Sequence, residues 1–140
     1  MTAPQAAKRA RPPALDAAVS TLEVPGLGEP YGMFVMADGN CLVTTSKHTL
    51  QLLTPAGWLT NIAGSNDDDQ KFVDGQRPAA RFNGPASMTV DAAGHIVVVD
   101  YGNNALRRVS KAGEVSTLAC NGEEGFVDGQ GEANPCPIQT

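Results

Sequence analysis

GPASMTVDAAGHIVVVDYGNNALRRVSKAGEVSTLA, residues 84–119, is the stretch that decides the fold of this 140-residue chain. Within it, four short runs of mostly apolar or β-branched residues alternate with turns that contain Gly, Asn or Asp. The runs are residues 87–91, 95–100, 105–109 and 114–119. This pattern predicts four antiparallel strands joined by tight turns.

The second run, His95–Asp100, is apolar on both sides, because successive side chains of a strand point to opposite faces. A sheet with two apolar faces must be covered on both of them. Radial stacking of four-stranded sheets, as in a β-propeller, achieves this. We therefore predict an all-β fold made of propeller blades.

The unit recurs along the chain. Phe72–Gln76 is repeated as Phe126–Gln130, and Leu59–Ala63 aligns with Val115–Ala119. The pattern that runs from Pro85 to Gly113 has a weaker copy at residues 30–57, and Val19–Leu22 begins like Val115–Ala119. We predict these parts: a disordered tail 1–18, a degenerate blade 19–58, a blade 59–114 with a long loop 63–85, and the start of a third blade with an irregular C-terminal end at 115–140.

The better-preserved copy resembles the NHL repeat. The resemblance rests on Gly84-Pro85, Met88–Asp91, Gly94, Ile96–Asp100, Gly102–Asn104, Leu106 and Gly113. The copy at 30–57 departs from the pattern, since Thr45 stands where Asp100 stands and Lys47-His48 replaces the Gly-Asn-Asn turn. The family often has Arg where this chain has Ala105. The resemblance implies NHL-like blades, which in the family form a ring of six.

Two full repeats and the start of a third are too few to close such a ring, so the sequence predicts an incomplete propeller arc. The apolar faces at its two ends would be uncovered. Three explanations follow: a fragment of a longer propeller protein, self-association through the uncovered blade faces, or an open arc. We favour the fragment, because Cys136–Thr140 breaks the repeat where Arg-Phe-Asn-Gly-Pro should recur.

The composition limits the functional classes. The net charge of −5 argues against a general nucleic-acid binder. No apolar run is long enough for a membrane helix, and no apolar segment follows Lys8, Arg9 and Arg11 as in a signal peptide. The three cysteines form no CxxC pair, and we expect free thiols in a reducing compartment. We expect a cytoplasmic protein, with the basic tail leaving a nuclear one open.

The long loop is the candidate binding region, because insertions in repeat proteins map to one face, which often binds partners. The candidate interaction residues are Phe72, Asp74, Arg81, Phe82, Asn83, Phe126 and Asp128. A structural role is open for the same residues: Phe72 and Phe126 would anchor the loop while Asp-Gly forms a turn. We expect a protein partner, which the sequence does not identify.

Other chemistry is poorly supported by the residues. Asn66–Asp69 lacks the spacing of a calcium loop, and His48 and His95 have no third ligand for zinc. Asp91 and Asp100 are expected to cap turns through backbone N–H groups rather than to act as an acid–base pair. We expect no cofactor, no metal and no catalytic residue.

The leading hypothesis is therefore a non-catalytic NHL-repeat protein-interaction scaffold. One alternative is a fragment of a six-bladed metal-dependent propeller enzyme of the lactonase or lyase type, which the resemblance implies. The other is an RNA-binding NHL propeller fragment, for which Arg81, Arg107, Arg108 and Lys111 would supply a basic cluster.

Overall fold

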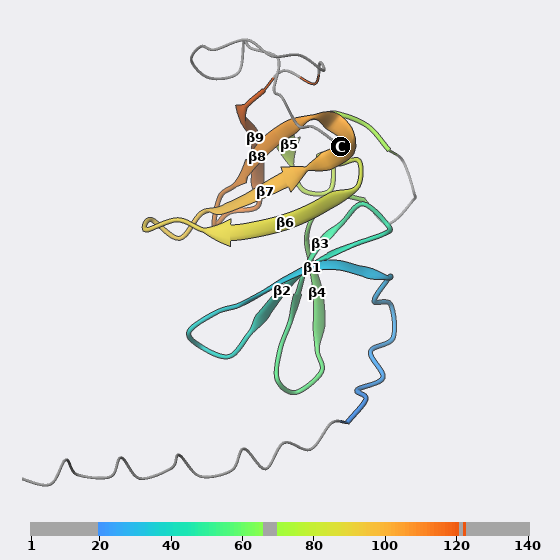
Figure 1. Cartoon of the computed structure of the whole chain (residues 1–140). Coiled ribbons are helices and arrows are strands. Elements are labelled where there is room, and N and C mark those ends of the chain that lie inside the picture. Colours follow the sequence, from blue (N-terminus) through green and yellow to red (C-terminus); the bar gives the residue numbers. More distant parts are fainter. Residues whose placement is uncertain (1–19, 66–69, 121, 123–140) are drawn as a thin grey trace, which may run out of the picture.

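Two antiparallel β-sheets and no α-helix make up the described part of the chain (Figure 1). The structure is a computed structural model that describes residues 20–65, 70–120 and 122. The predicted tail 1–18 and the candidate residues Phe126 and Asp128 lie outside these ranges. The predicted all-β fold of antiparallel blades is confirmed.

The first sheet has the strand order β1-β2-β3-β4, in which every strand pairs with its neighbour along the chain. Its strands are β1 Pro30–Val35, β2 Cys41–Thr45, β3 Leu50–Leu53 and β4 Leu59–Ala63. We call this sheet the first blade.

The second sheet, the second blade, has five strands in the order β5-β9-β8-β7-β6. Its elements are β5 Gly75–Gln76, β6 Pro85–Val90, β7 Ile96–Asp100, the 3₁₀ helix η1 Tyr101–Asn103, β8 Ala105–Val109 and β9 Glu114–Ala119. The four strands expected from the sequence are present. The fifth, β5, comes from the long loop and pairs with β9 at the sheet edge.

The predicted unit boundaries do not coincide with the blades. Residues 59–63 form the fourth strand of the first blade, and residues 115–119 belong to the fourth strand of the second. The predicted boundaries at 58/59 and 114/115 therefore fall one strand too early. The repeat read from the sequence is out of phase with the sheets, because similarity between segments does not show which strands pair.

The strand registers make the two blades equivalent residue by residue. Across the first blade, Met33, Val43, Gln51 and Asn61 form one row; across the second, Met88, Val98, Arg107 and Thr117 form the matching row. Since side chains alternate along a strand, this match also shows which face of one blade corresponds to which face of the other.

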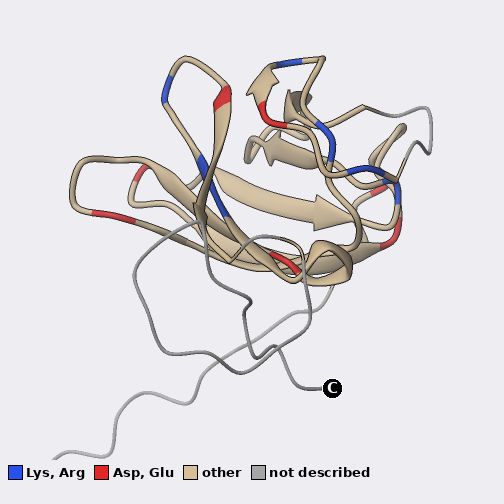
Figure 2. Ribbon diagram, turned by 90° about the horizontal axis from the view of Figure 1, so that it is seen from above, with Lys and Arg blue, Asp and Glu red and all other residues tan. Residues whose placement is uncertain are grey.

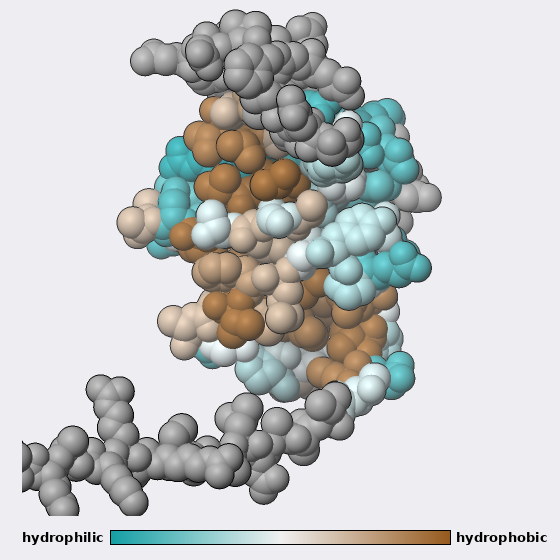
Figure 3. Space-filling model, viewed as in Figure 1, coloured by the Kyte–Doolittle hydropathy of each residue, from teal (hydrophilic) through white to brown (hydrophobic). Residues whose placement is uncertain are grey.

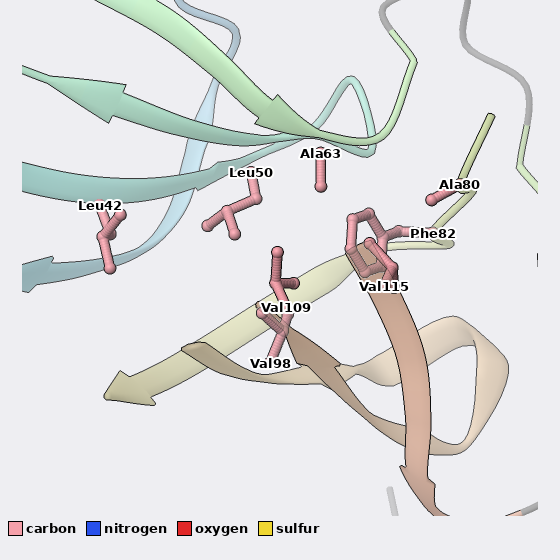
Figure 4. Close-up of a cluster of buried hydrophobic side chains, with 8 residues drawn as sticks. All are labelled: Leu42, Leu50, Ala63, Ala80, Phe82, Val98, Val109 and Val115. Atoms are coloured by element: carbon pink, nitrogen blue, oxygen red, sulfur yellow. The ribbon is translucent and has the colours of Figure 1, made fainter. Parts of the chain in front are cut away.

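The core lies between the blades (Figure 4). Leu42, Leu50 and Ala63 of the first blade face side chains from the second blade and its loop, and all are at most 1% exposed: Ala80, Phe82, Val98, Val109 and Val115. Burying one such large side chain contributes about 1.5–3 kcal/mol. Packing between the blades therefore holds the two sheets together.

Strands β1 and β2 of the first blade lie very close to β6 of the second blade. Thr44 Oγ1 donates a hydrogen bond to the carbonyl oxygen of Ala86 at 2.6 Å. A Cβ on Gly32 would lie 2.3 Å from the same oxygen, so only glycine fits there. The close contact fixes how β1 and β2 sit against β6.

In the described part of the chain, charged residues stand mostly in the turns and loops rather than in the strands (Figure 2). In the part of the chain that the structure describes, no helix is long and apolar enough to cross a membrane.

Candidate interaction surface

Arg107 in β8 is the fixed point around which the long loop folds. Its side chain is fully buried, although arginine is rarely buried unless it is paired. One guanidinium nitrogen, Nη1, donates to Asp100 Oδ2 at 2.7 Å, and the other, Nη2, donates to Asp74 Oδ1 at 2.6 Å. Arg107 therefore joins the end of β7 to the loop.

The same guanidinium also holds the loop backbone. Nη1 donates to the carbonyl oxygen of Arg81 at 3.1 Å, and Nη2 donates to that of Val73 at 2.9 Å. These two residues pair with each other as an isolated antiparallel bridge. The guanidinium carbon also lies 4.7 Å from the ring centre of Phe72 and 5.4 Å from that of Phe82, within the range of cation–π attraction.

Asp74 is held from a second side. Its carboxylate accepts hydrogen bonds from the backbone N–H and the hydroxyl of Thr117 in β9, both at 3.0–3.2 Å. The expectation that Asp74-Gly75 forms a turn was wrong: Gly75 begins β5, and Asp74 anchors the loop through charge and hydrogen bonds. The following residues, 77–79, make the turn.

The end of the loop is tied to η1. Asn83 N–H donates to Asp100 Oδ1 at 2.8 Å, and its side chain donates to the carbonyl oxygen of Gly102. Gly102 N–H in turn donates to the carbonyl oxygen of Asn83 at 2.8 Å. On the other side, Gly84 N–H donates to His48 Nδ1 of the first blade at 2.9 Å. The loop is thus fixed to both blades.

The hydrogen bonds that hold the loop in place leave an apolar patch exposed. Phe72 is 41% exposed, Val73 38% and Tyr101 of η1 46%. Asn103, also of η1, donates a side-chain hydrogen bond to the carbonyl oxygen of Lys71, so the loop and η1 lie side by side. We call Phe72, Val73 and Tyr101 the loop patch. Figure 3 shows that apolar side chains reach the surface on both blades.

The predicted interaction residues therefore have different surroundings. Phe72 is at the surface, and Asp74 is half exposed while bound to Arg107. Arg81 and Asn83 mainly contact the loop and η1. Phe82 is fully buried against the core, so its ring is not available to a partner, which corrects its assignment as a contact residue.

Sequence reasoning missed the role of Arg107. It was grouped with Arg108 as part of a basic cluster, but the two point to opposite faces of the second blade, as neighbours in a strand must. Arg107 is buried, whereas Arg108 contacts His95. The four basic residues of the RNA hypothesis therefore do not form one surface. The sequence did contain a signal for this difference, because two successive residues of the predicted strand 105–109 must point to opposite faces.

Asp91 and Asp100 lie at opposite ends of the hairpin formed by β6 and β7, so they do not form an acid–base pair. Asp91 accepts the N–H groups of Ala93 and His95, which confirms the expected turn cap. The hydrogen bond from the His95 backbone lowers the pKa of Asp91, against a smaller desolvation effect. Burial raises the pKa of Asp100, against hydrogen bonds from Asn103, Asn83 and Arg107, which lower it.

Described residues of the two blades line the following hollows. One of about 300 Å³ lies between the blades, lined mainly by apolar side chains of both, such as Leu42, Leu52, Ile62 and Ile96. The other, about 290 Å³, is lined by His95, Arg108, Ser110, Glu114 and Ser116 on the face of the second blade that points away from the first. None of the predicted site residues that the structure describes, Phe72, Asp74, Arg81, Phe82 and Asn83, lines either hollow. Among residues 20–65, 70–120 and 122, no group of three or more His, Cys, Asp or Glu is placed to hold a metal ion.

The cysteines differ from expectation. Cys41 has a free thiol, but Cys120 is disulfide-bonded. The prediction of free thiols was therefore wrong for Cys120, because spacing in the sequence does not show which residues the fold brings together.

Comparison with known proteins identifies the repeat. A family model described as the NHL repeat matches residues 82–108. No protein of curated function matches the sequence at a significant level. Among solved structures, a protein of unknown function from Bacteroides thetaiotaomicron VPI-5482 is 30% identical with a TM-score of 0.55, and the match covers 62% of this chain and 22% of that one.

An auxiliary nutrient binding protein from the same organism is 18% identical with a TM-score of 0.54, over 64% of this chain and 25% of that one. Virginiamycin B lyase from Staphylococcus aureus is 18% identical with a TM-score of 0.46, over 64% of this chain and 26% of that one. The chain thus spans about a quarter of the length of the structures that it matches.

Proposed function

Because residues 82–108 form an NHL repeat within two propeller-type blades, we propose that this chain is a non-catalytic protein-interaction scaffold and a portion of a longer propeller. The loop patch, Phe72, Val73 and Tyr101, is its contact surface for a protein partner. The observation that carries the proposal is the buried Arg107, which fixes this patch from behind.

The loop patch suits binding because its backbone is already ordered before a partner arrives. A loop that is ordered only on binding pays the cost of that ordering out of its affinity. Here the bonds from Arg107 to the Val73 carbonyl oxygen and from Thr117 to Asp74 hold the backbone after Phe72, and the bond from Asn103 to the Lys71 carbonyl oxygen holds the backbone before it. Aromatic residues that are both exposed and fixed are typical of the few positions that dominate protein–protein affinity. Phe72 and Tyr101 are of this kind.

The substitutions Phe72→Ala and Tyr101→Ala test the patch. We expect each to weaken capture of the partner by about 30-fold or more, the effect of losing a binding hot spot. The measurement is quantitative affinity capture from the source cell, with the wild-type chain and both variants side by side.

Trp58→Ala is the matched control, since Trp58 is also aromatic and 76% exposed but lies in the turn between β3 and β4. It should retain the partner at the wild-type level. A partner that binds all four proteins equally would contradict the assignment of the patch.

Metal content separates the scaffold from the enzyme alternative. A scaffold of this kind needs no metal, so we expect purified protein to hold no stoichiometric calcium or zinc after dialysis, as measured by elemental analysis. One equivalent of either ion would contradict the non-catalytic assignment and favour the lactonase or lyase type of propeller.

A further inference from the structure

The cavity of about 300 Å³ between the two blades, which we call the inter-blade cavity, has walls from both of them. Most of its lining is apolar: Met36, Leu42, Leu52, Ile62, Val90 and Ile96. These side chains belong to the core layer between the blades, yet all of them except Leu42 are only half-buried. Contact between apolar side chains and water is unfavourable, so the cavity favours an apolar occupant.

The other end of the same core layer shows how the gap between the blades can be filled. In Figure 4, Ala80 and Phe82 lie at one end of the buried cluster and Leu42 lies at the other. Ala80 and Phe82 come from the long loop, and both are fully buried between the sheets. At the end marked by Leu42, the inter-blade cavity takes the place of such inserted side chains.

The position of the cavity makes it independent of further blades. Blades of a propeller stack face to face, so additional blades would cover the outer faces of these two sheets. The inter-blade cavity lies between two faces that already pack against each other. Its rim includes Gly94 of the turn between β6 and β7, and Lys111 and Gly113 of the turn between β8 and β9. The site is therefore formed by this chain alone.

Arg77 is one of two cationic residues at this rim, and its side chain is exposed. Its backbone N–H donates to the carbonyl oxygen of Gly113 at 3.2 Å, which fixes it beside the turn between β8 and β9. Its guanidinium Nη1 donates to the carbonyl oxygen of Asn61 in β4 at 3.4 Å. Arg77 therefore reaches from the second blade to the first across the rim.

Lys111 is the second cation, and it is also exposed. A Cβ placed on Gly94 would lie 2.5 Å from Lys111 Cε and 3.1 Å from Nζ, so the ammonium group lies over the turn between β6 and β7. None of the described residues that line the cavity is Asp or Glu. The rim therefore carries two positive charges that no lining carboxylate balances, which favours an anionic group there.

We propose that the inter-blade cavity binds a straight-chain carboxylic acid, with the alkyl chain between the blades and the carboxylate at Arg77 and Lys111. A guanidinium can hold a carboxylate with two parallel hydrogen bonds. A methylene group is about as large as a water molecule, which takes up about 30 Å³, so the cavity holds at most roughly ten carbons.

This proposal goes beyond the protein-interaction role and does not rest on it. Tyr101 of the loop patch follows the end of β7, whereas Ile96 in the cavity begins that strand, so the two sites lie at opposite edges of the second blade. Phe72→Ala, which tests the loop patch, should therefore leave carboxylate binding unchanged. Failure of one proposal and failure of the other are separately visible.

Isothermal titration calorimetry with sodium octanoate tests the site, on protein purified at the length at which its cell makes it. We expect saturable binding of one octanoate per cavity. Hexanoate should bind up to about fifteenfold more weakly, since two fewer methylene groups are buried. Octanol, which has no charge, should bind more weakly than octanoate at low salt and should not respond to ionic strength.

Two variants separate the two parts of the site. Arg77→Gln combined with Lys111→Gln should weaken octanoate binding about tenfold, since each exposed charge contributes only modestly, and should leave octanol binding unchanged. Thr60→Trp places a large side chain at an exposed position of the lining and should abolish binding of both compounds. Lys47→Gln is the matched charge control, because Lys47 lies in the turn between β2 and β3, near the filled end of the core. It should bind octanoate like the wild type.

The proposal is overturned if octanoate does not bind, if its affinity does not depend on chain length, or if the double variant binds it as tightly as the wild type. Unchanged binding by Thr60→Trp would place the ligand elsewhere and would equally contradict the proposal. Circular dichroism shows whether each variant is folded. If Thr60→Trp is unfolded, Ile62→Phe, which also reduces the cavity, replaces it.

Discussion

Replacing Arg107 by Met is expected to lower the free energy of unfolding by about 3–5 kcal/mol, the typical cost of removing one partner of a buried ion pair. Asp100 is fully buried and would keep its carboxylate without the cation. The carbonyl oxygens of Val73 and Arg81 would also lose their donor. Such a loss is a large part of the stability of a small domain. Urea denaturation measures it.

The neighbouring residue provides the control. Arg108→Met makes the same chemical change on the opposite face, where Arg108 contacts His95 and is partly exposed. It should cost no more than about 1 kcal/mol. Equal effects of the two substitutions would show that Arg107 is not the fixed point of the loop.

The cost of Arg107→Met should also depend on pH. Burial already raises the pKa of Asp100, and removal of the guanidinium raises it further. A carboxyl group whose pKa is higher in the folded than in the unfolded chain favours folding below the unfolded pKa, and this contribution is lost as the pH rises through the folded pKa. The variant should therefore be closer to the wild type near pH 4 than at pH 7. Asp100→Asn added to Arg107→Met should restore part of the stability at pH 7, because the uncompensated charge is removed.

Gly64→Ala is expected to have the second largest effect, about 2–5 kcal/mol. Gly64 has φ +83°, where an L side chain costs about 1–2 kcal/mol. Its new Cβ would also lie 2.4 Å from the carbonyl oxygen of His48 and 3.1 Å from Thr49 Cα. Overpacking of this kind adds about 1–3 kcal/mol, and the obstacle is backbone, which cannot rotate away.

Gly57→Ala separates the two contributions. Gly57 has φ +88°, but the nearest atom to its new Cβ would be Leu22 Cδ2 at 3.9 Å. It should lose only the conformational part, about 1–2 kcal/mol. In Gly64→Ala, the displaced His48 should also release the Gly84 amide that it holds, so hydrogen exchange at Gly84 should accelerate. Equal destabilisation by both substitutions would argue against the close contact.

Much of the fold depends on residues close together in the chain and could therefore be predicted from the sequence. The β-branched run Ile96–Val99 and the turns around Gly94 and Gly113 predict strands and hairpins without knowledge of distant contacts. The repeat made the second sheet a copy of the first. The fifth strand β5 was missed, because two residues carry no periodic signal and β5 exists only by pairing with β9, some forty residues later.

The candidate site was only half predicted, and its residues show why. Phe72 and Asp74 were singled out from their repetition, but repetition does not separate an exposed ring from a buried one, so Phe82 was assigned to the surface. Arg107 looked like one more basic residue beside Arg108. Its true surroundings are Asp74, Asp100 and two loop carbonyls, which come from three separate segments of the chain.

The order of residues alone thus determined which short segments become strands, where they turn, and that apolar faces must be covered, because these properties depend on side-chain type and spacing within a few residues. Only the tertiary structure decided which strands share a sheet, which of two adjacent arginines is buried, and that the ring of Phe72 is exposed while that of Phe82 is buried. These outcomes depend on contacts between segments that are far apart along the chain, and such contacts form only when the sheets pack together.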